Sequence, residues 1–170
     1  TPQALVQEMV AEAPKQRDVA LYVRDPHVLV ALAPQQLFLD PSHTFRLRLN
    51  PKPAWSEAAP RHGWFVRRAR PQDEGDINRI LVARQMVPVS EGYMATVDQQ
   101  AAVCMLVAQD DEGAVVGVVT GIDHVHACGD PEQGCSLWSL AVDPQCVRPG
   151  IGMALIEDLV QCCSERDRHY

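Results

Sequence analysis

The chain has 170 residues, of which 46% are hydrophobic and 22% charged, and its net charge is −7. This composition excludes a disordered chain and predicts a folded domain with room for a small appendage. Residues 1–85 hold twelve Lys and Arg and nine Asp and Glu. Residues 86–170 hold three Lys and Arg and thirteen Asp and Glu. The acidic second half argues against a nucleic-acid partner, and no apolar run reaches the roughly 20 residues that a membrane span needs.

The first 50 residues predict a small β-rich extension. Residues 3–12 have the apolar spacing of a short helix. Residues 51–62 are rich in Pro and Ala and predict a linker, so a second domain is expected over residues 63–170. The strands of the extension are expected in the apolar runs 19–23, 28–32, 37–39 and 44–49.

The second domain is predicted to alternate strands and helices. A helix is expected after Pro71, with Ile77, Ile80 and Leu81 on one face, and another from about Gly150. A hairpin turn is predicted at 110–113 and a polar loop at 123–134. The expected strands cover residues 64–69, 101–109, 114–122 and 135–142.

The six cysteines all lie in the second half of the sequence. Because no secretion signal is visible, they predict reduced thiols and a cytoplasmic protein. Alternating residues of a strand would bring His124, His126 and Cys128 to one face, with Cys135 as a fourth zinc ligand. The usual paired ligand spacing is absent, so a polar loop without metal is the preferred interpretation.

Two glycines, Gly150 and Gly152, stand between the last predicted strand and the last predicted helix. Glycine lets the backbone approach a ligand, and first-turn helix amides are free to bind an anion such as a pyrophosphate. A Walker P-loop is excluded because no Lys follows Lys52. A dinucleotide fingerprint would need a third glycine at Leu155, so an oxidoreductase fragment is the less favoured alternative.

With this order of elements, the segment Val147-Arg148-Pro149-Gly150-Ile151-Gly152 resembles the loop Gln/Arg-x-x-Gly-x-Gly/Ala of GCN5-related N-acetyltransferases (GNAT). Both glycines match, whereas Val147 stands where that family has Gln or Arg. The resemblance implies an α/β fold with a mixed, mostly antiparallel sheet flanked by helices, whose last family elements would be missing after Tyr170. It also implies that acetyl-CoA is the cosubstrate and that its pyrophosphate contacts Val147, Arg148, Gly150, Ile151, Gly152, Met153 and Ala154.

The same resemblance implies that the backbone of Leu140, Ala141 and Val142 pairs with pantetheine, with the Leu140 amide polarising the thioester carbonyl. The candidates for the base near strand ends are Asp123, His124 and Glu132, with Glu91 more remote. Of these, His has the most suitable reference pKa. Ser136 and Ser139 lack a nucleophile elbow, and Trp138 is predicted to be a core residue.

Segments 21–27, 39–47, 121–125 and 136–144 resemble the amino-terminal part of N-acetylglutaminylglutamine synthetases. In that family an acetyltransferase domain precedes an ATP-grasp peptide-ligase domain. The resemblance implies a small-molecule amine acceptor, glutamine or a glutamine dipeptide, and a covalently attached ligase domain. The alternative is a non-catalytic acyl-CoA-binding module that regulates such a ligase.

Overall fold

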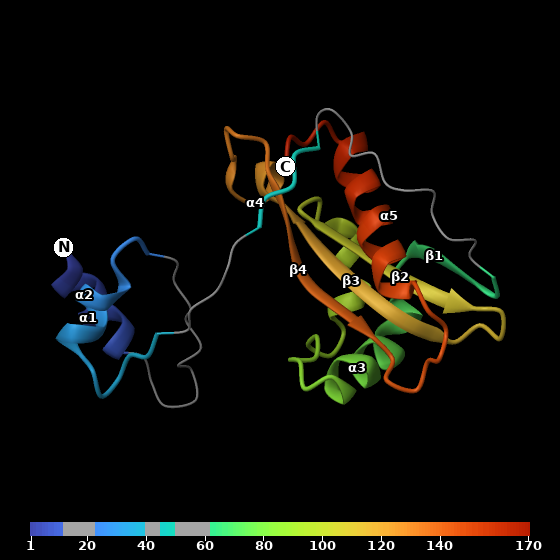
Figure 1. The fold of residues 1–170 in the computed structure, drawn as a ribbon, viewed down its shortest axis with the longest axis horizontal. Helices are drawn as coiled ribbons and strands as arrows, with labels where there is room; N and C mark the ends of the chain where they lie inside the picture. The colour runs from blue at the N-terminus through green and yellow to red at the C-terminus, as the bar shows by residue number, and fades with distance from the viewer. Residues whose placement is uncertain (12–22, 40–44, 50–61) are drawn as a thin grey trace. The chain divides into compact units, whose positions relative to one another are not determined.

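The computed structural model describes residues 1–11, 23–39, 45–49 and 62–170. They form two compact units, Thr1–Phe45 and Arg46–Tyr170, whereas the sequence analysis places a boundary after residue 50. The first unit contains helix α1 (Pro2–Ala11), which confirms the predicted helix, and helix α2 (Pro26–Leu32), both blue in Figure 1. Their buried contact consists of Val6, Leu29 and Ala33.

The strand predicted over residues 28–32 is wrong, because this segment is helix α2. Pro26 occupies the first helical turn, where its fixed φ and missing N–H are tolerated. The β-branched Val28 and Val30 favour a strand by propensity, but burial of Leu29 against α1 favours the helix. Packing therefore outweighs local preference here.

No strand lies in the described part of residues 1–50, so the β-rich extension is wrong for that part. Residues 37–39 and 45–49 have no regular secondary structure. Residues 19–22 and 44, where strands are predicted, lie outside the described residues, as does nearly all of the predicted linker over 51–62.

The second unit is built on a four-stranded antiparallel sheet with the order β1-β2-β3-β4 (Figure 1). The strands are β1 (Trp64–Arg68), β2 (Val103–Asp110), β3 (Val115–Asp123) and β4 (Cys135–Val142). The predicted strands and the two long predicted helices of this unit are confirmed to within a few residues. The helices are α3 (Glu74–Ala83), α4 (His124–Cys128) and α5 (Ile151–Glu165), with short 3₁₀ turns η1 (Pro71–Asp73), η2 (Tyr93–Ala95) and η3 (Val97–Gln99).

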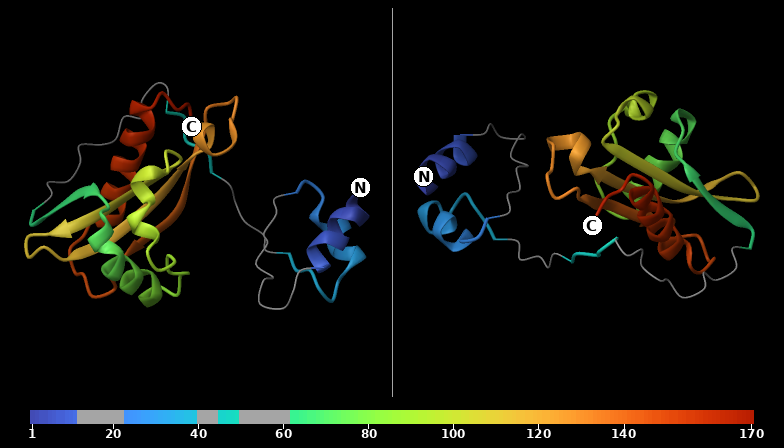
Figure 2. Two further views of the ribbon diagram at one scale, coloured as in Figure 1. Left: turned by 180° about the vertical axis from the view of Figure 1, so that it is seen from behind. Right: turned by 90° about the horizontal axis from the view of Figure 1, so that it is seen from above.

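Helices α3 and α5 cover opposite faces of the sheet, which gives three layers (Figure 2). Alternate residues of β2 serve the two faces. Cys104, Leu106 and Ala108 pack with α5, whereas Met105 and Val107 pack with α3. Burial on both faces explains why these strands are continuous apolar runs in the sequence.

Two glycines of β3 allow α5 to lie close to the sheet. A Cβ on Gly117 would lie 2.9 Å from Ile151 Cγ2, and one on Gly121 would lie 2.5 Å from Leu159 Cδ1. Any side chain at these positions would need the space that α5 occupies. The two glycines therefore set the height of α5, and of the loop before it, above the sheet.

Residues 123–134, predicted to be a polar loop, begin with the short helix α4. Asp123 caps it, since its carboxylate accepts hydrogen bonds from the amides of Val125 and His126 at 3.1 and 3.4 Å. The side chains of His124, His126 and Cys128 therefore project from a helix and do not share the face of a strand. The part of the chain that the structure describes holds no cluster of three or more metal-ligating side chains.

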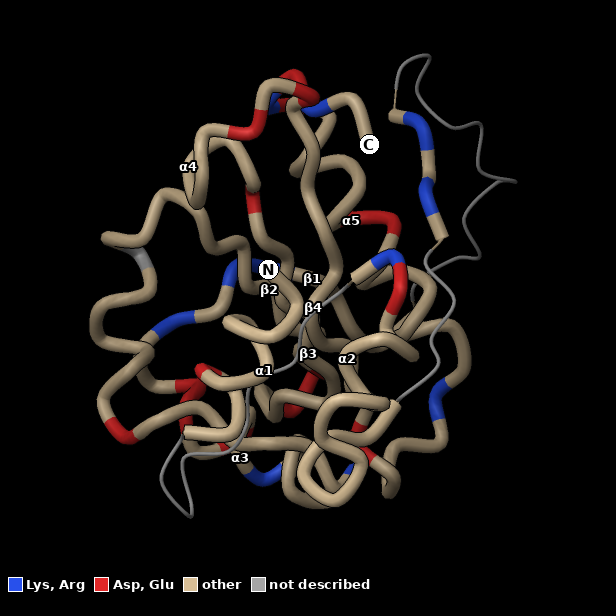
Figure 3. Tube along the Cα trace, turned by 90° about the vertical axis from the view of Figure 1, so that its left-hand side faces the viewer, with Lys and Arg blue, Asp and Glu red and all other residues tan. Residues whose placement is uncertain are grey.

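Along the described part of the Cα trace, Lys and Arg occur as short separate segments (Figure 3). The trace of the second unit also carries acidic segments near α4 and α3. Among the described helices, none combines the length and the apolar character that crossing a membrane requires.

Candidate functional site

A glycine loop connects β4 to α5 and ends in a left-handed residue. Gly150 is the N-cap of α5 with a φ of +87°, which L side chains rarely adopt. Among the residues that the structure describes, a Cβ at Gly150 would have no neighbour within 4 Å beyond the adjoining backbone. Among the described residues, the amides of Ile151, Gly152 and Met153 have no hydrogen-bond acceptor. Three donors at the positive end of the helix dipole are therefore available to an anion.

Three residues predicted to bind the same anion have other surroundings. The Ala154 amide, predicted to contact the pyrophosphate, donates to the Gly150 carbonyl at 3.0 Å within the helix. The Arg148 guanidinium lies against Gly63, where a Cβ would be 2.9 Å from Nη1. This nitrogen is buried and has no partner within the described ranges, so it keeps an unused donor. The Val147 side chain is fully open to solvent.

Strand β4 is the outer strand of the described sheet, and its free edge presents alternate backbone groups. The Asp143 amide donates to a carbonyl of β3 at 2.9 Å, so the antiparallel alternation makes Ala141 the next residue to pair with β3. Leu140 and Val142 then direct their backbone groups to the free edge. The Val142 carbonyl indeed accepts a hydrogen bond from Arg84 Nε at 2.7 Å. Of the predicted pantetheine segment, Leu140 and Val142 face outward and Ala141 does not.

Helix α3 holds the start of the glycine loop through Arg79. Its guanidinium forms an ion pair with Asp143 and donates from Nη2 to the Val115 carbonyl at 3.1 Å. The hydrogen bond from Arg79 holds the pKa of the buried Asp143 carboxyl below its ordinary value. Asp143 also accepts from the Gln145 amide at 2.8 Å. These contacts fix the first residues after β4.

His124, a predicted base, belongs to a row of hydrogen-bonding side chains at the start of β4. Its Nε2 is 2.8 Å from Ser136 Oγ, which accepts the Trp138 indole N–H at 3.0 Å. The other ring nitrogen, Nδ1, lies 3.8 Å from the Asp130 carboxylate, so we assign a proton to Nδ1. Nε2 is then left to accept the hydroxyl proton of Ser136. Hydrogen bonds from the Gly134 and Glu132 amides lower the pKa of Asp130, which favours its ionised form.

Trp138 is 74% exposed, so the prediction that it is a core residue is wrong. The register between β3 and β4 shifts here. Thr120 pairs with Ser139 and Gly121 with Leu137, which leaves Trp138 without a partner on β3. Such a bulge re-aims a side chain, and the apolar run 135–142 carries no sign of it.

Asp123, also predicted as a base, has a structural role. Its carboxylate is 3% exposed and is surrounded by donors. Burial raises the pKa of Asp123, but hydrogen bonds, above all from Arg168 and His126, outweigh burial and hold this pKa well below its ordinary range. An acid with its oxygens so occupied is a poor proton acceptor. Its side-chain donors are Arg166 Nη1 at 3.3 Å, Arg168 Nε at 2.9 Å and His126 Nδ1 at 2.9 Å.

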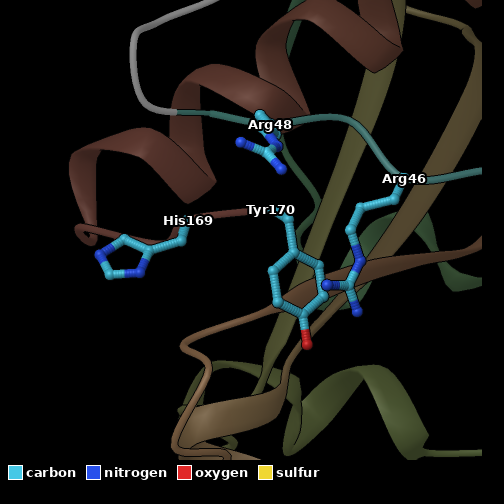
Figure 4. A pocket seen from close by; sticks show the side chains of 4 residues that line it. All are labelled: Arg46, Arg48, His169 and Tyr170. Carbon is cyan, nitrogen blue, oxygen red and sulfur yellow. The ribbon is translucent and has the colours of Figure 1, made fainter.

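A cavity of about 350 Å³ lies beside the His124 row and is lined by Arg46, Arg48, His169 and Tyr170 (Figure 4). The Arg46 guanidinium lies over the Tyr170 ring, 3.8 Å from its centroid. It also pairs with Glu132 at 3.2 Å, so this third predicted base is part of an exposed ion pair. The Tyr170 hydroxyl donates to Asp130 at 3.1 Å, which links the cavity to the His124 row.

Sequence analysis does not identify Arg46, Arg48, Asp130 or Tyr170. The cavity forms because residues 46–49 lie beside the last residues, where the Leu49 amide donates to the His169 carbonyl at 2.9 Å. These segments are far apart in the sequence and carry no motif. No signal within either segment could have found the cavity.

A model of the acetyltransferase (GNAT) family matches residues 76–169, which include β4, the glycine loop and α5. The chain belongs to the GNAT family. This membership indicates an N-acetyltransferase, and acetyl-CoA is the cosubstrate in GNAT enzymes. No curated protein matches the chain.

Solved structures share the GNAT fold at low sequence identity. Ard1 from Thermoplasma volcanium has a TM-score of 0.51 at 19% identity, over 62% of this chain and 67% of its own. A GNAT acetyltransferase from Staphylococcus aureus has a TM-score of 0.52 at 9% identity, over 62% of this chain and 82% of its own. These two similarities show the fold. A Brucella melitensis GNAT acetyltransferase in complex with acetyl-CoA is 24% identical over 64% and 73%, with a TM-score of 0.47.

Proposed function

We propose that this chain transfers the acetyl group of acetyl-CoA to the amine of a small molecule, glutamine or a glutamine dipeptide. GNAT membership supports the donor and the reaction class. The acceptor is supported by the resemblance to N-acetylglutaminylglutamine synthetases and by the cationic cavity that Arg46 and Arg48 line. The same resemblance supports an ATP-grasp ligase domain in the full-length protein.

The observation that carries the proposal is the set of free amides at the start of α5. Acetyl-CoA contains a pyrophosphate, and oriented N–H groups at a helix N-terminus bind such anions. Because Gly150 has no side chain, the phosphates can approach the amides of Ile151, Gly152 and Met153 closely. Arg148, in the same loop, directs its Nη1 against Gly63, where this nitrogen is buried without a partner among the described residues. When bound, acetyl-CoA supplies the activated thioester.

The free edge of β4 suits the pantetheine arm. Leu140 directs its N–H and C=O away from β3, so an extended ligand can pair with it as another strand would. The Leu140 N–H is then placed to stabilise the oxyanion that develops on the thioester carbonyl. Ala141 pairs with β3 and its side chain is buried, so it holds β4 in the sheet and leaves the outer edge to Leu140 and Val142.

His124 is the base in this proposal and receives the proton of the acceptor amine through Ser136. Ser136 lies four residues before Leu140, about 13 Å along the strand. Ordered water or the acceptor itself must therefore join the two ends of this path. The exposed Trp138 indole stands between them and offers an apolar surface to the acceptor.

Replacing Gly150 with Asp is expected to weaken acetyl-CoA binding by about tenfold or more, which is about 1.4 kcal/mol. The carboxylate would repel the pyrophosphate and block its approach to the helix amides. Isothermal titration of both proteins with acetyl-CoA measures the change. Gly129→Asp is the matched control, because Gly129 also has a positive φ and open space around it. Unchanged affinity in Gly150→Asp would contradict the phosphate site.

The acceptor is tested by thiol release from acetyl-CoA in the full-length protein. Glutamine and Gln-Gln are expected to support release about tenfold faster than glutaminol, which lacks the carboxylate that Arg46 and Arg48 would bind. Arg48→Gln is expected to raise the KM for glutamine without changing the Kd for acetyl-CoA. Arg24→Gln, in the first unit, is the control. Acetyl-CoA binding without acceptor-dependent release would instead favour the non-catalytic acyl-CoA-binding module.

A further inference from the structure

Two thiols meet between α5 and the sheet, apart from the residues assigned to acetyl-CoA. Cys104 on β2 is buried, and Cys162 near the end of α5 is half-buried. Their Sγ atoms are 3.1 Å apart, and both are free thiols. Cys104 donates its S–H to the sulfur of Cys162, which favours negative charge on Cys162.

Positive groups also surround the sulfur of Cys162. Arg68 on β1 donates from Nη2 at 3.4 Å, and Arg166 after α5 adds attraction, whereas Glu165 and burial oppose them. The hydrogen bond from Cys104, together with the two arginines, lowers the pKa of Cys162 to about 6. A thiol of this kind is mostly thiolate at neutral pH, which is the form that reacts with oxidants.

We propose that Cys104 and Cys162 form a peroxide-reactive dithiol that closes to a disulfide. The Cys162 thiolate attacks one oxygen of a hydroperoxide, so that an S–O bond forms, the O–O bond breaks and the released alkoxide or hydroxide takes a proton from water. The Cys104 sulfur then attacks the sulfenic sulfur. The S–S bond forms, the S–O bond breaks and the Cys104 proton leaves with hydroxide as water. The two thiols lose two electrons and the peroxide gains them.

The neighbouring cysteines form hydrogen bonds with other groups. Cys163 follows Cys162 directly, but it donates to Cys135 on β4. Cys128 is exposed and donates to the His124 carbonyl at 3.2 Å. The partner that the fold presents to an oxidised Cys162 is therefore Cys104. The bond would join the end of α5 to β2 inside the core that they already share.

Oxidation of the whole chain with hydrogen peroxide, followed by mass spectrometry under non-reducing conditions, tests the proposal. We expect a loss of about 2 Da and a peptide pair linked through Cys104 and Cys162. The melting temperature is expected to rise by several degrees and to return after reduction, because the bond closes a long loop. No loss of mass, a link between Cys135 and Cys163, or oxidation confined to Cys128 would overturn the proposal.

Variants separate the two steps. Cys104→Ser is expected to retain a sulfenic acid at Cys162 that dimedone traps, whereas Cys162→Ser is expected to form no disulfide with Cys104. Cys128→Ser is the control and should behave as the unsubstituted chain. A second measurement needs no variant: the rate of Cys162 alkylation in the native chain should rise with an inflection near pH 6, and an inflection above pH 8 would contradict the thiolate.

Discussion

Asp123 stands where three parts of the second unit meet. It ends β3, caps α4 and accepts hydrogen bonds from Arg166 and Arg168, which follow α5. A buried carboxylate is tolerated only with such partners, because its removal from water is costly. The residue that looks like a base in the sequence therefore anchors the end of α5 beside the His124 row.

Asp123→Asn is expected to lower the free energy of unfolding at pH 7 by about 3 kcal/mol, since two guanidinium groups lose a buried partner. The folded pKa of Asp123 lies below its ordinary value of 3.8, so its stabilisation is complete above about pH 4 and is lost as the pH falls further. The difference in the free energy of unfolding between the unsubstituted chain and Asp123→Asn should therefore become smaller below pH 4. Urea unfolding at several pH values measures it.

The control for this series is Glu112→Gln, at the exposed tip of the hairpin between β2 and β3. It should leave the stability within about 0.5 kcal/mol at every pH. A constant difference between Asp123→Asn and the unsubstituted chain down to pH 2 would show that the loss comes from packing and not from charge.

Part of the site could be predicted from sequence because its geometry is local. Gly150 and Gly152 precede a strongly periodic helix, and a helix N-terminus always leaves free amides. The partners of His124 and Asp123 could not be predicted, because hydrogen bonds to Ser136 and Arg168 depend on how distant segments meet. From the sequence, only the reference pKa of histidine favours His124 over Asp123 and Glu132 as the base. The structure separates the three residues by their burial and their hydrogen-bond partners.

At the scale of elements, the position of α5 follows from the missing side chains of β3. Gly121 contacts the Leu159 side chain, and Gly117 contacts those of Ile151 and Leu155. A helix that lies this close brings its first turn down to the end of β4. The distance between the free amides at the start of α5 and the free edge of β4 is therefore set by residues on a neighbouring strand.

Gly121→Ala is expected to destabilise the chain by about 2 kcal/mol, because the added methyl would lie 2.5 Å from Leu159 Cδ1. Gly75→Ala is the matched control. Gly75 lies in α3 with nothing within 4 Å of an added Cβ, so alanine should stabilise the helix by about 0.5 kcal/mol. Thermal unfolding compares the two. Equal changes in stability for the two variants would show that α5 moves to accommodate a methyl group at Gly121.

The elements themselves could largely be predicted, since apolar periodicity and turn residues identify the four strands, α3 and α5. Two errors have physical reasons. Helix α2 contains β-branched residues whose strand propensity is outweighed by packing of Leu29 on α1. The bulge at Trp138 depends on the register with β3, which no single segment encodes.

At the scale of the whole molecule, ion pairs in the fold join the two unequally charged halves of the sequence. Residues 46–170 hold twelve Lys and Arg and seventeen Asp and Glu, with most of the cations before residue 86. Arg46 pairs with Glu132 and Arg79 with Asp143, so cations from the first half of the sequence meet acids from the second. The charge of each half of the sequence therefore argues against a nucleic-acid partner, but it does not show how charges pair in the fold.

The ion pair between Arg79 and Asp143 makes the start of the glycine loop depend on a distant helix. Asp143 opens the glycine loop, yet its partner sits on the opposite face of the sheet, 64 positions earlier. Loss of Arg79 would leave the buried Asp143 carboxylate without its guanidinium partner and free the first residues after β4. A substitution on α3, a helix to which we assign no contact with the ligand, is therefore expected to alter the start of the ligand loop.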